Sequence, residues 1–139
     1  MSDPNPQIRS IPRDCTAARA RLATAQRFAD SAAVRGLHPE ASFILYYDAA
    51  RNALSAVLSV AGIRVVEGRG AHAITIREAG RLLGPTLRRE IIAIDGARVA
   101  RNRTEYDAQP VGQHQVGSIR RATLTILDAC RRHVEGGCP

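Results

Sequence analysis

The chain has 139 residues and a formal net charge of +7, and all 20 of its basic residues are arginines. This length suits one domain with a single hydrophobic core, which needs neither disulfides nor a metal ion for stability. Scarce aromatic residues and frequent alanine favour close-packed helices over a strand-rich sandwich, and the excess of positive charge permits binding to RNA, DNA or another polyanion without requiring it.

Three segments are expected in the first half of the chain. Residues 1–13 are polar, contain three prolines and hold no apolar stretch, which predicts a flexible lead-in rather than a signal peptide. Asp14 then caps a first helix, whose apolar stripe continues until Gly36 stops it. A second helix begins near Pro39 and extends to about residue 62, and its broad apolar face makes it the central helix of the fold.

The middle of the chain interrupts this helical periodicity. Residues 64–75 contain two glycines and read as a link between helices. A short helix is expected over residues 76–84, and Pro85 suits the first turn of a long helix that follows it. This long helix reaches about residue 107.

A last helix completes the predicted fold, from about Gln113 to Val134. Four long helices with short connections or a single-helix connection predict an all-α, antiparallel bundle of four to five helices. The bundle domain is expected over residues 14–135, and residues 136–139 are expected to be a tail.

The three cysteines, Cys15, Cys130 and Cys138, form no CxxC pair and have no matching histidine cluster. This pattern indicates neither a zinc site nor a disulfide framework, and we expect no metal or cofactor. Cys15 and Cys130 are expected in the core and Cys138 as an exposed thiol of the tail. No window is long and apolar enough to span a bilayer, so the sequence predicts a cytoplasmic protein.

One face of the long helix at residues 87–107 changes from apolar to charged. Apolar residues first recur at the spacing of a buried face, at Leu87, Ile91 and Ile94. The same series then continues with Arg98, Arg101 and Glu105. One interpretation is an electropositive site in which guanidinium groups hold a phosphate. The other is a helix end that emerges into solvent, where the arginines pair with nearby acidic residues.

The order of these elements resembles the HEPN superfamily over about residues 14–135. The resemblance rests on YYDAARNAL at residues 46–54, EGRGAH at residues 67–72 and RVARNRTEYD at residues 98–107. HEPN domains are bundles of four or five helices, usually dimeric, and many are metal-independent endoribonucleases of toxin, defence or RNA-processing systems. Their signature is an arginine, often followed by a polar residue, and then a histidine after an interval of four to six residues.

The resemblance assigns the signature arginine to Arg101 and the polar residue to Asn102. The position expected to hold histidine is Tyr106, and His114 comes too late, at the start of another helix. A tyrosine, with a pKa of about 10, is protonated at neutral pH, so Tyr106 is a proton donor rather than a base. Glu105 lies four residues after Arg101, where an ion pair keeps its basicity low.

Further polar residues can face the same site. Asp48, Arg51 and Asn52 on the central helix can do so, with Asp48 orienting Arg101, or can form a polar edge of that helix. His72 can supply the missing acid or base across an interface, although a loop histidine is more often a cap or an exposed residue. Two core residues with satisfied hydroxyl groups are expected at Tyr46 and Tyr47.

Two functions follow from the resemblance. In the first, a cytoplasmic homodimer acts on RNA, with Arg101 as phosphate clamp, Asn102 as orienting group and Tyr106 as proton donor, and the family's expectation is a metal-independent endoribonuclease of the toxin or defence type. The binding residues beside them are Arg98, Glu105 and Asp48. In the second, the same fold is a non-catalytic module for a partner such as a nucleotidyltransferase or an antitoxin, and Tyr106 is its aromatic anchor.

Overall fold

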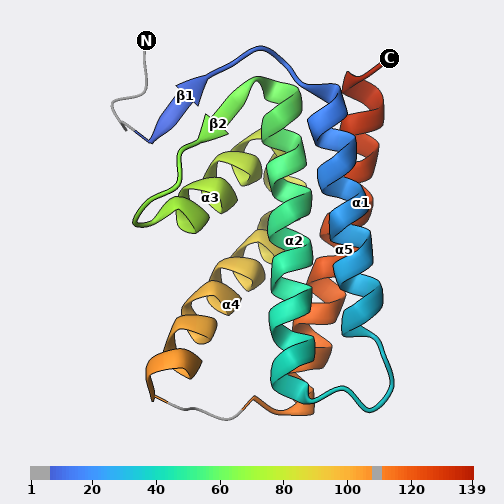
Figure 1. Cartoon of the computed structure of the whole chain (residues 1–139), viewed down its shortest axis with the longest axis vertical. Helices are drawn as coiled ribbons and strands as arrows, with labels where there is room; N and C mark the ends of the chain where they lie inside the picture. The colour runs from blue at the N-terminus through green and yellow to red at the C-terminus, as the bar shows by residue number, and fades with distance from the viewer. Residues whose placement is uncertain (1–6, 108–110) are drawn as a thin grey trace.

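The computed structural model describes residues 7–107 and 111–139, apart from the side chains of residues 103–107. In this part of the chain five α-helices form a bundle beside a two-stranded sheet (Figure 1). The all-α prediction is therefore confirmed. Among the described helices, none combines the length with the apolar content that a membrane span requires.

Three helices form the body of the bundle: α1 (Cys15–Ala32), α2 (Pro39–Ala61) and α5 (Gln113–Gly137). They lie side by side, α1 antiparallel to α2 and α5 in the same direction as α2 (Figure 1). Buried alanines such as Ala25, Ala29 and Ala50 let α1 and α2 approach closely. Most of the length of α2 is buried, so it is the central helix, as its broad apolar face predicts.

The boundaries of α1 and α2 follow from local chemistry. The Oδ1 atom of Asp14 accepts a hydrogen bond of 2.9 Å from the Ala17 amide, which confirms the predicted cap of α1. α2 ends at Gly62, whose φ of +72° is in the left-handed region. A Cβ atom at this position would lie 2.6 Å from the Ile11 carbonyl oxygen. Only glycine therefore fits, and the chain passes directly into β2 (Ile63–Val65).

The two-stranded sheet was not expected from the sequence. β1 (Ile8–Ser10) pairs antiparallel with β2, and Arg9 lies opposite Arg64. A flexible lead-in was expected over residues 1–13, of which residues 1–6 lie outside the described part of the chain. The expectation is wrong for Ile8–Ser10, which form β1. A strand of three residues is too short to show an alternating pattern, and its pairing depends on β2, which is distant in sequence.

Two helices lie obliquely on one side of α2: α3 (Ala71–Leu83) and α4 (Arg88–Asp107), joined through a 3-10 turn at Pro85–Leu87 (Figure 1). α3 begins five residues before the predicted start at residue 76, because Gly70 with a φ of +79° ends the link and the next turn is already helical. His72 therefore lies in the first turn of a helix and not in a loop.

The start of α1 and the residue after α5 are joined by a disulfide between Cys15 and Cys138, with a Cα–Cα distance of 5.9 Å. The expectations of no disulfide and of an exposed Cys138 thiol are therefore wrong, and Cys15, expected in the core, is half-buried. α5 also continues to Gly137, which shortens the tail expected at residues 136–139. The start of α1 and the end of α5 lie at the same end of the bundle, which no local pattern reveals (Figure 1). Cys130 is buried, as predicted.

Candidate functional site

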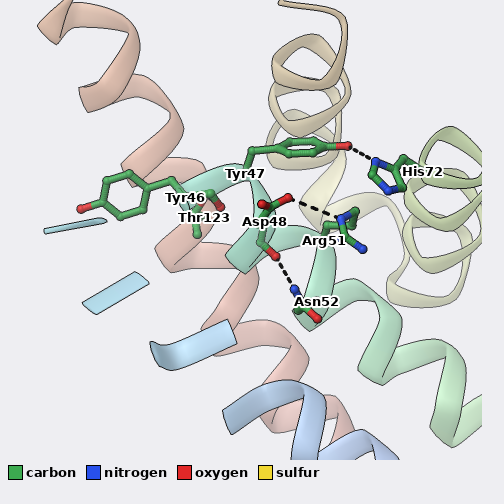
Figure 2. A network of polar contacts seen from close by, with 7 residues as sticks. All are labelled: Tyr46, Tyr47, Asp48, Arg51, Asn52, His72 and Thr123. Atoms are coloured by element: carbon green, nitrogen blue, oxygen red, sulfur yellow. Dashed lines mark hydrogen bonds and ion pairs between the residues drawn. The ribbon is translucent and has the colours of Figure 1, made fainter. Parts of the chain in front are cut away.

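The first part of the candidate site is a polar strip on α2. Asp48 and Arg51 form an ion pair one turn apart, with 3.6 Å between Oδ1 and Nε, and their side chains are 22% and 25% exposed. The Nε atom of Arg51 is buried and has no hydrogen-bond partner in the described part of the chain. Asn52 donates a hydrogen bond of 2.8 Å to the main-chain oxygen of Asp48 (Figure 2). Asp48 thus orients Arg51, whereas the sequence suggested that Asp48 would orient Arg101.

Tyr47 connects this strip to α3. Its side chain is fully buried, and its hydroxyl lies 3.3 Å from Nδ1 of His72, within hydrogen-bond distance (Figure 2). Tyr46 points the other way, and its main-chain oxygen accepts a hydrogen bond from the Thr123 hydroxyl (Figure 2). Both tyrosines are buried, as expected. The polar partner of Tyr47 is the histidine that the sequence placed in a loop.

α4 brings two arginines to the same place. The Cζ atom of Arg101 lies 5.7 Å from the centre of the Tyr47 ring, within the range of a cation–π contact. The Nε atom of Arg101 is buried and, like that of Arg51, has no hydrogen-bond partner among the described residues. Arg98, one turn earlier, is held by Asp95 at 2.9 Å. The charged continuation of the α4 core face thus packs on an aromatic ring at Arg101.

The surroundings keep both His72 and Tyr47 uncharged at neutral pH. Burial lowers the pKa of His72 below its ordinary value of 6.5, and the guanidinium groups of Arg51 and Arg101 lower it further. Burial raises the pKa of Tyr47 to about 12, against the opposing effect of the same two arginines. The site therefore combines a neutral imidazole and a neutral phenol with the positive charges of Arg51 and Arg101 and the carboxylate of Asp48, which raises both pKa values.

The remaining predicted site residues contribute less to this cluster. Asn102 is exposed and lies about 100° around α4 from Arg101, so the structure does not bring it to the cluster. Glu105 and Tyr106 belong to the last turns of α4, but their side chains lie outside the described residues. The residues that the structure does bring together are Tyr47, Asp48, Arg51, His72, Arg98 and Arg101.

His72 and Arg51 also line a cavity of about 300 Å³ between α1, α2, β2 and α3. Two more arginines line it, Arg21 from α1 and Arg64 from β2. Neither could be selected from the sequence, because only the fold places them beside Arg51. The cavity gives the cluster a space, next to an ionisable side chain, that a small anionic group can enter.

The described residues contain no group of three or more His, Cys, Asp or Glu side chains that would hold a metal ion. Comparisons with protein-family models, with curated proteins and with solved structures found no match for this chain. The chemistry of the cluster is therefore interpreted from its geometry. A neutral imidazole beside two guanidinium groups suits proton transfer next to a bound phosphate.

Proposed function

We propose that the chain is a HEPN-type domain that binds RNA and cleaves it without a metal ion. One observation carries the proposal: Arg51 and Arg101, both near the Tyr47–His72 pair, each have a buried Nε–H group without a hydrogen-bond partner among the described residues, and the Nε atom of Arg51 is only ion-paired with Asp48 at 3.6 Å. A buried donor without a partner costs free energy. A phosphate oxygen satisfies such a donor and neutralises the guanidinium charge at the same time.

His72 is the proposed general base. With its proton on Nδ1, it donates to the Tyr47 oxygen, and Nε2 is left as an acceptor. Nε2 takes the proton of an RNA 2′-hydroxyl while that oxygen forms a bond to the adjacent phosphorus, and the bond from phosphorus to the 5′-oxygen breaks. The resulting imidazolium returns the proton to the departing 5′-oxygen. The products are a cyclic 2′,3′-phosphate end and a 5′-hydroxyl end.

The two arginines stabilise the negative charge that develops on the phosphate during this step. The resemblance to HEPN domains supports the assignment, because their signature also combines an arginine and a histidine. In this chain His72 would take the role of the signature histidine from a different helix, and Tyr106 need not act as a base. The two functional groups then come from one copy of the chain.

Replacing Arg101 with alanine is expected to reduce cleavage of RNA by about 10²-fold or more, because one fixed charge on the transition state is lost. The measurement is the cleavage rate of a labelled, mixed-sequence RNA by the purified protein in EDTA. Arg120→Ala is the matched control, since it removes one exposed arginine from α5 and none of the cluster residues.

Equal rates for Arg101→Ala and Arg120→Ala would rule out the cluster as the cleavage site. Loss of all cleavage in EDTA would rule out the metal-independent reaction. RNA retention on a filter, measured with the same variants, separates binding from cleavage.

We also propose that the outer face of α4 binds a second copy of the chain. Ile92 is 59% exposed and Val99 is 38% exposed, and Gly96 lies between them at helical spacing. Arg101 follows Val99 by two residues, so this stripe lies about 200° around α4 from Arg101. Two helices paired along it would therefore keep the two Arg101 clusters apart, each complete within its own copy.

Ile92→Glu is expected to convert the dimer into a monomer at micromolar concentration, because it places a charge in an apolar contact. Size-exclusion chromatography with light scattering measures the mass. Val34→Glu is the control, since Val34 is equally exposed, at 59%, but follows α1. A mass that is the same for wild type and Ile92→Glu would contradict pairing of two copies along α4. If the stripe instead captures a nucleotidyltransferase or an antitoxin, Ile92→Glu would abolish that complex and leave the mass of the isolated chain unchanged.

A further inference from the structure

The cavity beside His72 has walls of three kinds. Arginines from three elements contribute positive charge: Arg21, Arg51 and Arg64. Hydroxyl groups from α2 and α3 come next: Ser55, Ser59 and Thr75. Much of the remaining surface is aliphatic, with Leu58 and Ile63 among its residues. A ligand that matches all three walls carries a phosphate, polar ring or sugar atoms, and an apolar face.

The polar groups of the cavity retain capacity for a ligand. The hydroxyls of Ser59 and Thr75 donate to the main-chain oxygens of Ser55 and Ala71, and their oxygens remain acceptors. The carboxylates at the cavity are Asp14 and Glu67, and Oδ1 of Asp14 is used by the cap of α1. With Asp48, which pairs with Arg51, three carboxylates balance the three arginines, so a ligand phosphate would be recognised by the placement of Arg21 and Arg64 and not by an excess of positive charge.

Arg64 comes from the sheet, where it lies opposite Arg9 in the β1–β2 pair. A ligand held by Arg64 can also reach Arg51 and His72, because all three side chains line one cavity.

We propose that this cavity binds a single unstacked nucleotide, which contributes the attacking 2′-hydroxyl and places its 3′-phosphate at Arg51 and His72. This inference rests on the proposed function for its role in cleavage, although nucleotide binding itself does not require cleavage. A volume of about 300 Å³ lies at the lower end of small-molecule sites and suits one nucleotide. A base can enter such a cavity only when it is not stacked in a helix, so the substrate is single-stranded RNA.

Nucleoside 3′-monophosphates test the cavity without any need for turnover. Binding to the full chain is measured by calorimetry for the four nucleotides, for the matching nucleosides and for inorganic phosphate. We expect the nucleotides to bind at least tenfold more tightly than phosphate or nucleosides. Arg64→Ala is expected to weaken nucleotide binding by about tenfold, since it removes one charge-assisted contact. Arg120→Ala is the control for net charge and should bind like wild type.

Filling the cavity provides a second, independent variant. Ser55→Phe places a ring inside it and is expected to abolish nucleotide binding, whereas Thr125→Phe, at an exposed position of α5, should have no effect. If the filled variant does not fold, Arg64→Ala still decides the question. Inorganic phosphate that binds as tightly as the nucleotides would overturn the proposal, and so would unchanged nucleotide affinity in the folded variants.

The outcomes separate this inference from the proposed function. RNA cleavage by a protein that binds no nucleotide, or that cuts duplex as fast as single strands, would overturn the cavity assignment and leave the cleavage site in place. The converse outcome is a protein that binds nucleotides, with weaker binding in Arg64→Ala, but cuts no RNA. That result would support nucleotide binding in the cavity and rule out the proposed ribonuclease activity.

Discussion

Replacement of His72 by alanine is expected to lower the rate of RNA cleavage by about 10²- to 10⁴-fold, the range that a general base contributes. His72 is half-buried in the first turn of α3, so its loss should leave the bundle folded. His72→Gln keeps polar atoms near the Tyr47 hydroxyl but cannot take up a proton in this pH range, and its rate should be equally low. His114→Ala is the control, because His114 is exposed on α5.

The measurement is a single-turnover rate with enzyme in excess, together with a thermal unfolding curve for each variant. Wild-type cleavage by His72→Gln in a folded protein would show that no proton passes through this side chain. A low rate in both His72 variants but not in His114→Ala would support the assigned role, since the variants share only the lost imidazole.

The pH dependence gives the same assignment a second readout. Neutral imidazole is the base, so the rate should fall as the pH falls through the pKa of His72, which lies below 6.5 because of burial and the charges of Arg51 and Arg101. Arg51→Gln removes one of these charges, so the pKa should rise and the acid limb should move to higher pH. The NMR signal of the imidazole ring measures this pKa without activity, and a value above 6.5 in the wild-type protein would contradict the description of the site.

Helices could be predicted where their signals are local. The Asp14 cap and the broad apolar stripe of α2 each involve residues within a few turns of one another, and both agree with the structure. The strands β1 and β2 could not be predicted, because each has three residues and gains its hydrogen bonds from a partner distant in sequence. The start of α3 was misplaced because its first turn follows two glycines, which usually indicate a loop.

The candidate site was visible in part for the same reason. A break in an apolar stripe can be detected within α4, so Arg98 and Arg101 could be selected from the sequence. Their neighbours Tyr47 and His72 come from other helices, and the oblique packing of α3 and α4 on α2 decides the contact. One local signal was available: Tyr47 and Arg51 are four residues apart and therefore lie on the same face of α2. Read together with Arg101, this spacing indicates where the charged face of α4 meets the central helix.

Reduction of the Cys15–Cys138 disulfide is expected to lower the free energy of unfolding by about 2–5 kcal/mol, because the bond closes a loop across most of the chain. For a domain of this size the melting temperature should fall by about 5–15 °C. Thermal unfolding with and without a thiol reductant measures the change. The Cys15→Ser, Cys138→Ser double variant should melt at the lower temperature in both conditions, which separates this bond from any effect of the reductant on buried Cys130.

The bond acts on contacts that already hold the end of α5 against the start of α1. Arg13 and Arg19 donate hydrogen bonds to the main-chain oxygens of Gly137 and Pro139, at 2.9 and 2.6 Å. Both contacts are exposed, so each contributes little without the covalent link. Equal melting curves in oxidised and reduced protein would mean that these contacts hold the end of α5 against the start of α1 without the disulfide.

The disulfide also links the stability of the protein to the redox state of its surroundings. Structural disulfides persist in oxidising compartments and are rare in the cytosol, whereas the sequence alone predicted a cytoplasmic protein. In a reducing cytosol the chain would have the lower stability of the double variant. The start of α1 also forms a wall of the cavity beside His72, through Asp14 and Ala17. If reduction loosens this end of the bundle, the affinity for nucleoside 3′-monophosphates should fall in the same samples in which the melting temperature falls. An unchanged affinity would show that the cavity does not depend on the disulfide.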